Sequence, residues 1–173
     1  MLNRPAVFII VSVVIVVVVF LLRQSSSYLV INRKGFGARI MTPRPVSVSQ
    51  LSSVFAQLNA KHKDASWAAF TFCPPDEQAT EQTSVNLQYS MEGGKIGFDW
   101  ILLAPRNIAD KEKIIAFMKD KHYLVLEREG NGVKYLRVED GDLVQLGTQI
   151  AEFYHLQADS EMGMLMDGFE WKP

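Results

Sequence analysis

The hydrophobic pattern divides the chain into one long apolar run and a series of short periodic segments. The run covers Ala6 to Leu22 and contains a single polar side chain, that of Ser12. Seventeen helical residues at about 1.5 Å each give roughly 26 Å, enough to span a thin bilayer. We therefore expect a transmembrane anchor in residues 1–23, with the lipid bilayer as its partner.

The segment that follows, residues 24–46, contains glycines and prolines and shows little periodicity, which is typical of a tether. A helix is predicted from Ser49 onward, because apolar residues recur at i, i+3, i+4 and i+7. These residues are Leu51, Val54, Phe55 and Leu58. Ser66–Cys73 then predicts a strand that Pro74 and Pro75 end, and a polar loop follows at Gln78–Gln82.

The stretch from Thr83 to Leu103 predicts a β-hairpin, with Gly93-Gly94 as its two-residue turn. Counting outward from the turn places six apolar residues on one face. They pair as Met91 with Ile96, Tyr89 with Phe98 and Leu87 with Trp100. Gln88, Ser90 and Asp99 fall on the other face, which we expect to be solvated. A slip of one residue would mix the two faces, so the register is well specified.

A helix and a second hairpin are predicted next. Pro105 ends the first hairpin, and Asn107 or Asp110 can cap a helix that runs to about Lys121. Its buried side is formed by Ile114, Ile115, Phe117 and Met118. The second hairpin joins Tyr123–Glu129 to Val133–Glu139 around Gly130-Asn131-Gly132.

The register of the second hairpin has two solutions. A three-residue turn would align Leu124 and Leu126 with Val138 and Leu136. A four-residue turn would instead bury Val125 with Leu136. The hydrophobic pattern does not choose between them.

The last two elements complete the pattern. Asp140 or Asp142 can cap a helix whose buried residues are Leu143, Leu146, Ile150, Phe153 and Tyr154. A final strand is expected from about Met162 to Trp171. From Lys95 the order is strand, helix, strand, strand, helix, strand, which predicts an α+β, ferredoxin-like antiparallel sheet. The Gly93-Gly94 turn also requires the strand that begins at Lys95 to pair with the strand before the turn. Either the ferredoxin-like sheet is therefore rearranged, or the strands before Lys95 extend another edge of it.

Charge is distributed unevenly along the chain. Residues 1–45 contain six basic and no acidic side chains, which leaves 12 basic and 19 acidic ones and a net charge of −7 in the remainder. Residues 47–173 are therefore expected to form one acidic domain, long enough to bury a core with the single Cys73 and no disulfide. An acidic domain repels phosphate backbones, so we expect no nucleic-acid partner.

The basic residues also bear on orientation. Arg23, Arg33, Lys34 and Arg39 follow the apolar run closely, and the positive-inside rule then favours a cytoplasmic C-terminal domain. A cleaved signal peptide with an external domain is the alternative, with small serines after Arg23 near a cleavage point. The run is longer than a usual signal core, and Arg23 interrupts its end, which favours the uncleaved anchor.

Two similar tetrapeptides are candidate chemistry. GFDW at Gly97–Trp100 recurs as GFEW at Gly168–Trp171, and Asp99 and Glu170 would form a hydrolase pair if they lined one pocket. The plainer interpretation is two similar strands, each with its aromatic residues in the core and its carboxylate in solvent.

Other candidate ligands are weaker. Met162, Met164 and Met166 alternate on the final strand and would suit Cu(I), although such methionines are far more often core packing. Asp140-Gly141-Asp142 fits a turn and helix cap better than a calcium loop, because no further oxygen ligands follow. The three histidines are isolated and suit surface or helix-end positions. No metal site and no cofactor are therefore expected.

The part of the chain from Gly97 to Trp171 resembles the regulator-of-ribonuclease-E B family. The pieces that carry the resemblance are Phe98–Pro105, His122-Tyr123-Leu124-Val125 and Asp167-Gly168-Phe169. His122 stands where the family has glycine, and Phe169 stands where it has tryptophan. The resemblance implies a non-catalytic domain that regulates by binding another protein.

The sequence thus predicts a single-pass membrane protein whose α+β domain binds a protein partner and is not an enzyme. The interaction candidates are Asp99, Trp100, Asp167, Phe169 and Glu170. The alternatives are a membrane-bound hydrolase that uses Asp99 and Glu170, and a copper-handling domain of the cell envelope.

Overall fold

The computed structural model describes residues 28–31, 38–130 and 132–173. The chain forms two compact units, Met1–Arg44 and Pro45–Pro173. The predicted anchor Ala6–Leu22 lies outside the described residues. Among the residues that are described, no helix has the length and apolar character needed to cross a membrane.

The first unit contains a hairpin that the sequence did not predict. Strands β1 (Tyr28–Ile31) and β2 (Ala38–Met41) pair antiparallel, with Tyr28 opposite Met41. Both strands fall within residues 24–46, where only a tether was expected. Each strand has only four residues, and Tyr28–Ile31 has no polar residue, so alternation gives little signal for a strand here.

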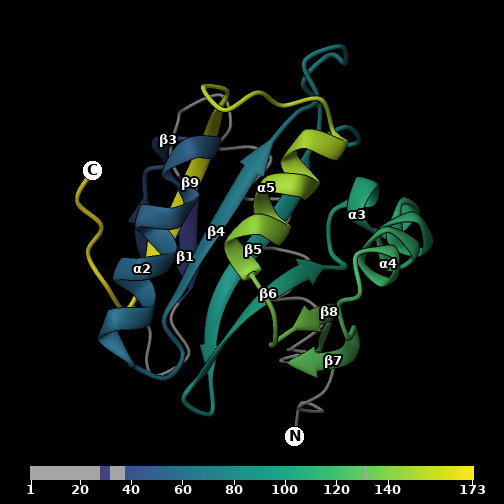
Figure 1. Ribbon diagram of the computed structural model, residues 1–173. Helices are drawn as coiled ribbons and strands as arrows, with labels where there is room; N and C mark the ends of the chain where they lie inside the picture. The colour runs from purple at the N-terminus through teal and green to yellow at the C-terminus, as the bar shows by residue number, and fades with distance from the viewer. Residues whose placement is uncertain (1–27, 32–37, 131) are drawn as a thin grey trace, which may run out of the picture. The chain divides into compact units, whose positions relative to one another are not determined.

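The second unit is built on a seven-stranded sheet in the order β3-β9-β4-β5-β6-β8-β7, which confirms the predicted α+β class with an antiparallel sheet (Figure 1). The strands are β3 (Arg44–Ser47), β4 (Trp67–Phe72), β5 (Val85–Glu92), β6 (Lys95–Ile101), β7 (Leu126–Gly130), β8 (Val133–Val138) and β9 (Glu161–Asp167). The helices are η1 (Val48–Gln50), α2 (Leu51–Lys61), α3 (Pro105–Ala109), α4 (Lys111–Asp120) and α5 (Leu143–Phe153).

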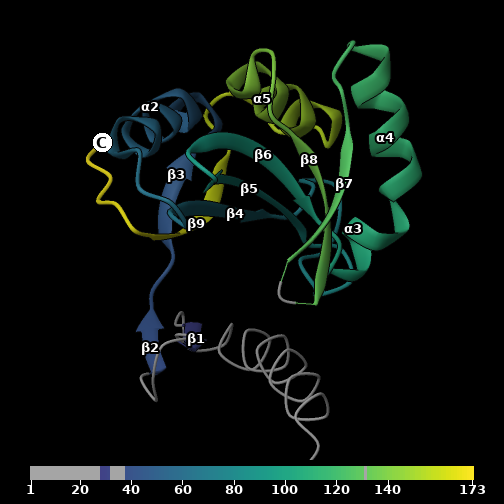
Figure 2. The same cartoon turned by 90° about the horizontal axis from the view of Figure 1, so that it is seen from below.

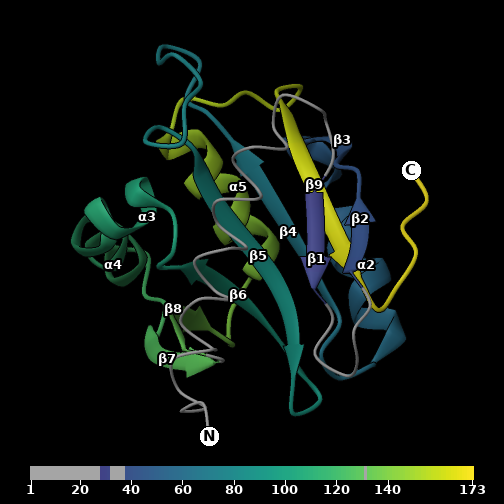
Figure 3. The same cartoon turned by 180° about the vertical axis from the view of Figure 1, so that it is seen from behind.

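The helices cover one face of this sheet. Figure 2 shows α2 and α5 side by side on the same side of β4, β5 and β6. Figure 3 shows the sheet from behind, where no helix of residues 45–130 or 132–173 lies over these three strands. We call this second surface the open face.

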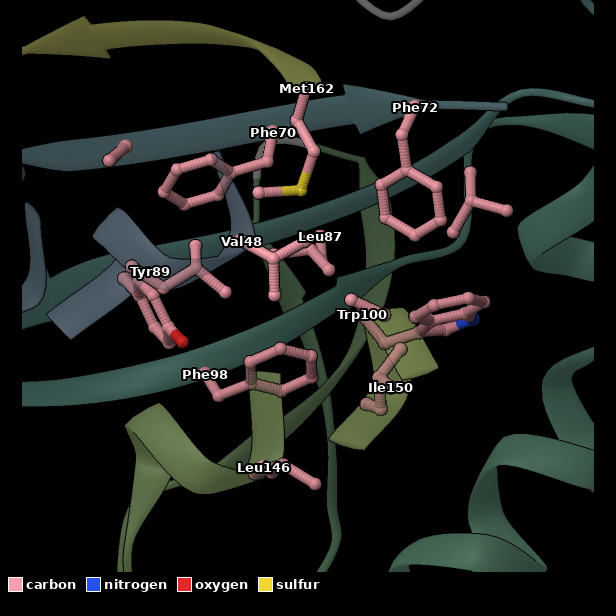
Figure 4. Packing of buried hydrophobic residues seen from close by; sticks show 14 of the residues in the cluster. Val48, Phe70, Phe72, Leu87, Tyr89, Phe98, Trp100, Leu146, Ile150 and Met162 are labelled. Atoms are coloured by element: carbon pink, nitrogen blue, oxygen red, sulfur yellow. The ribbon is translucent and has the colours of Figure 1, made fainter. Parts of the chain in front are cut away.

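The core lies between the sheet and the helices. In Figure 4, Phe70, Tyr89 and Phe98 project from neighbouring strands toward Leu146 and Ile150 of α5. The ring of Tyr89 lies edge-on to Phe70 at 5.8 Å and to Phe98 at 6.0 Å between centroids. Such aromatic pairs add about 1 kcal/mol each to the burial of their surface.

The first hairpin has the predicted register. Met91 pairs with Ile96, Tyr89 with Phe98 and Leu87 with Trp100. The turn residues Gly93 and Gly94 have φ values of 58° and 78°, which a two-residue hairpin turn requires and glycine adopts without strain.

The ferredoxin-like strand order is wrong. That order would place β9 beside β6, whereas β9 pairs with β4 and lies three strands away from β6. The tight Gly93-Gly94 turn forces β5 onto one edge of β6, and β8 occupies the other edge. The β4–β5 pair is thereby inserted between β6 and β9, so the sheet is rearranged.

The second hairpin follows neither predicted register. Gly130 pairs directly with Val133, which leaves two residues in the turn, and Gly132 has a φ of 80°. Leu126 consequently lies opposite Arg137 rather than opposite Leu136. β7 also begins three residues later than predicted, at Leu126, so Tyr123 belongs to the preceding loop.

Two further boundaries differ from the prediction. The helix expected to run to Lys121 is divided at Asp110 into α3 and α4, with Pro105 in the first turn of α3. The final strand ends at Asp167 instead of Trp171. The cap of α5 is as predicted, because the Gln145 N–H donates to Asp142 Oδ1 at 2.9 Å.

Candidate functional site

The open face carries one continuous cross-strand row of six residues. Register pairs connect Leu165 to Ala69, then Gln88, Asp99, Arg137 and finally Leu126. The row therefore has apolar residues at both ends and charged ones in the middle. We take the open face, with the charged centre of this row, as the candidate site.

An ion pair lies at the centre. Arg137 Nη1 donates to Asp99 Oδ1 at 2.7 Å, and the side chains are 0% and 1% exposed. Ser90 completes the arrangement, because its Oγ accepts from Arg137 Nη1 at 2.9 Å and donates to Asp99 Oδ2. We call Ser90, Asp99 and Arg137 the buried triad.

Gly97 makes room for the guanidinium. A Cβ at this position would lie 2.6 Å from Arg137 Nη2 and 2.7 Å from Nη1. The guanidinium thus lies flat against the backbone of β6, where Nη2 also donates to the Lys95 carbonyl oxygen at 3.1 Å. The missing side chain explains how Arg137 is buried on a face that no helix covers in the described part of this unit.

Further charged groups surround the buried triad. Arg137 Nε donates to Glu139 Oε1 at 2.7 Å and lies 3.7 Å from Glu92 Oε2. Tyr135 donates its hydroxyl to Glu92 Oε1 at 2.8 Å. Lys95 Nζ lies 3.8 Å from Glu139 Oε2. Three carboxylates, those of Asp99, Glu92 and Glu139, therefore converge on one guanidinium.

Burial controls the titration of this cluster. Desolvation raises the pKa of Asp99 to about 6, although Arg137 and Ser90 act in the opposite direction. Burial alone would lower the pKa of Arg137, but Asp99 and Glu139 outweigh it and raise that pKa. Burial and the bond to Glu92 raise the pKa of Tyr135 to about 12.

The expectation that Asp99 is solvated is wrong, although its face is correct. Asp99 lies on the predicted side of β6 but is 1% exposed. Sequence reasoning missed Ser90, Gly97 and Arg137 as its partners. The signal was the glycine two residues before Asp99, which leaves space on the same face, but the β6–β8 pairing is needed to see which side chain fills it.

The other interaction candidates do not form one surface. Asp167 is exposed and pairs with Trp67 at the end of the open face. Trp100 is fully buried on the helix-covered side, where its Nε1 donates to the Asn107 carbonyl at 3.0 Å. Phe169 packs against the core, and Glu170 is exposed in the C-terminal segment.

The structure does not bring Asp99 and Glu170 together. β4 and β5 separate β6 from β9, a span of roughly 14 Å at the usual strand spacing. The residue after Glu170, Trp171, donates its indole N–H to Ser53 Oγ of α2 at 3.3 Å, on the helix-covered side. The GFEW segment also lies beyond β9, so the two tetrapeptides are not two similar strands.

The remaining candidates take structural positions. Met162 and Met164 are buried in the core, and Figure 4 shows Met162 beside Phe70 and Phe72. Met166 is partly buried and packs against this core. Asp140 accepts from Lys95 Nζ at 2.9 Å. His62, His122 and His155 follow the ends of α2, α4 and α5, which confirms their helix-end interpretation.

Comparison with known proteins gave no match to any family model, curated protein or solved structure.

Proposed function

We propose that residues 45–173 form a non-catalytic regulatory domain that binds a protein partner through the open face, held at a membrane by Ala6–Leu22. The observation that carries the proposal is the six-residue row from Leu165 to Leu126, on a sheet face without a covering helix in the described part of this unit.

The side chains of the open face suit a protein partner. Trp67, Ala69 and Leu165 are each partly exposed, and they lie on the adjacent strands β4 and β9. Protein interfaces typically combine a partly exposed apolar patch with polar groups at its border. Thr71 and Asn86 add a polar border, joined by a 2.6 Å hydrogen bond.

The buried triad supports binding rather than catalysis. Asp99, Ser90 and Arg137 direct their polar atoms toward one another, and none is exposed by more than a few per cent. A general acid or nucleophile has to reach a substrate, which these atoms cannot do without rearrangement. The triad instead fixes β5, β6 and β8 as a firm platform.

The membrane and regulatory parts of the proposal rest on the sequence. The apolar run Ala6–Leu22 supports the anchor, and the basic residues after it support a cytoplasmic domain. The resemblance to the regulator-of-ribonuclease-E B family over residues 97–171 supports regulation by protein binding.

A matched pair of substitutions tests the docking surface. Ala69→Arg places a long charged side chain in the apolar patch beside Leu165, whereas Glu152→Arg places the same side chain on the exposed surface of α5. The full-length protein is extracted from its own membranes with mild detergent, and co-purified proteins are quantified. We expect Ala69→Arg to lose a specific partner that Glu152→Arg retains. Equal recovery of every co-purified protein with both variants would contradict the proposal.

A further inference from the structure

We propose that the buried triad is a proton-operated switch: uptake of one proton by Asp99 in mildly acidic conditions releases Arg137 from β6 and changes the open face. The proposal starts from the geometry of the cluster. Of the three carboxylates, that of Asp99 is the most buried, with 1% of its side chain exposed. The side chains of Glu139 and Glu92 are 19% and 45% exposed.

The charges that face Asp99 are unbalanced. β5 contributes Ser90 and Glu92, and β8 contributes Tyr135 and Arg137, with Glu139 just after its end. β6 itself contributes Lys95, whose amine points to Asp140 and Glu139 rather than to Asp99. Three carboxylates share one buried guanidinium, so protonation of the least solvated carboxylate relieves their repulsion most.

The proton has a defined place in the network. It binds Asp99 Oδ2 from solvent, and the bond to Ser90 reverses, so that the new Asp99 hydroxyl donates to Ser90 Oγ. The Ser90 hydrogen turns away from the carboxyl group. Asp99 becomes neutral, and the charge-assisted bond from Arg137 Nη1, now 2.7 Å, is weakened to a neutral one.

After Asp99 is neutralised, the remaining ionised partners of Arg137 are the more exposed carboxylates of Glu139 and Glu92. Glu139 and Glu92 both lie near its Nε, at 2.7 Å and 3.7 Å, and they draw the guanidinium away from Asp99. Gly97 presents no Cβ to block this movement. The face gains one positive charge and a displaced side chain at its centre. An effect on partner binding rests on the function proposed above, whereas the switch itself does not.

Carboxyl and guanidinium resonances test the switch without any partner. The full-length protein, labelled with ¹³C and ¹⁵N in detergent micelles, is titrated from about pH 7.5 to about pH 5. We expect the Asp99 ¹³Cγ and Arg137 ¹⁵Nε signals to shift together, with one midpoint near 6. Asp99→Asn should hold Arg137 ¹⁵Nε at its acid position throughout, while Asp167→Asn, on the same face, should titrate as the wild type does.

Ser90→Ala provides a second variant should Asp99→Asn fail to fold. The Ser90 hydroxyl stabilises the ionised form of Asp99, so its removal should move the shared midpoint upward. The proposal is wrong if Asp99 ¹³Cγ titrates below about pH 5, as an ordinary aspartate does. It is also wrong if the Arg137 signal keeps its midpoint in Asp99→Asn, or if Ser90→Ala leaves the midpoint unchanged.

Discussion

At the scale of single residues, the three histidines adopt backbone conformations that usually belong to glycine. His62, His122 and His155 have φ values of 45°, 64° and 63° and lie one or two residues after the last residues of α2, α4 and α5. Each closes its helix with a backbone bond, as His155 N does to the Glu152 carbonyl at 2.8 Å. In this left-handed conformation, a residue that carries a Cβ is less favourable than glycine by about 1 kcal/mol.

Replacement by glycine should therefore stabilise the protein. We expect His155→Gly and His62→Gly each to raise the free energy of unfolding by about 0.5–1 kcal/mol, measured by chemical denaturation. His155→Ala is the matched control, since it removes the imidazole but keeps the Cβ. If His155→Ala stabilises as much as His155→Gly, the backbone conformation is not the cause.

The Asp99–Arg137 pair gives a second prediction at this scale. Arg137→Met leaves the Asp99 carboxylate buried without a counter-charge. This substitution should lower the free energy of unfolding by about 3–5 kcal/mol at pH 7.5. Asp99→Asn should cost clearly less, because Arg137 keeps Glu139 at 2.7 Å. Equal losses in the two variants, measured by urea denaturation, would contradict this description of the pair.

The same pair determines a pH dependence. Because the pKa of Asp99 rises from 3.8 to about 6 on folding, the unfolded chain releases its proton first as the pH increases. As the pH rises from about 4 to about 6, Asp99 therefore lowers the free energy of unfolding by up to roughly 3 kcal/mol. Above that range its effect on the free energy of unfolding is constant. Relative to Asp99→Asn, the wild type should gain stability on acidification from pH 7.5 to 5. A difference that does not change with pH would show that Asp99 titrates normally.

Residue patterns predicted the face of Asp99 but not its burial. The alternation of apolar and polar residues within β6 alone predicts on which face each side chain lies. It placed Asp99 on the face away from the core. Burial depends on Arg137, which is 38 residues away in the sequence and reaches Asp99 through the β6–β8 pairing. A single sequence has no local signal for such a contact.

At the scale of elements, α5 approaches the sheet closely because of one glycine. A Cβ on Gly147 would collide with the Tyr89 hydroxyl and lie 3.2 Å from Tyr89 Cζ. That hydroxyl donates to the Leu143 carbonyl of the same helix at 3.2 Å. Gly147 thus permits both the packing of α5 on β5 and this hydrogen bond.

Gly147→Ala should destabilise the protein, although alanine is the better helix former by about 1 kcal/mol. We expect a loss of about 1–3 kcal/mol from overpacking, and a smaller loss when Tyr89→Phe removes the colliding oxygen. A double-mutant cycle in urea measures this coupling. Additive losses in the cycle would mean that the two side chains do not compete for the same space.

From α2 onward the order of helices and strands was predicted from the sequence, except that α3 and α4 were expected as one helix. The strands β1, β2 and β3 were not predicted, and the pairing of the strands was only partly predictable. The β5–β6 pairing follows from a local turn signal, and its register was predicted residue by residue. The partner of β9 depends on where β4 and β5 insert, which is a competition among distant strands. The β7–β8 register depends on a two-residue turn that the glycines on both sides of residue 131 made ambiguous.

At the scale of the whole molecule, the chain combines a basic N-terminal part with an acidic domain. All six basic side chains of residues 1–45 precede a unit with a net charge of −7. This division agrees with the membrane anchoring proposed above, because anionic lipid headgroups attract a basic segment and repel an acidic domain.

Site-specific photo-crosslinking in intact cells shows whether a partner protein docks on the open face, as we propose. A photoreactive amino acid is placed at Ala69, beside Leu165 in the row, and at Glu152 on α5 as the control. We predict a discrete crosslinked protein from position 69 that is absent from position 152. No crosslink from position 69, or the same products from both positions, would show that no partner docks at this part of the open face.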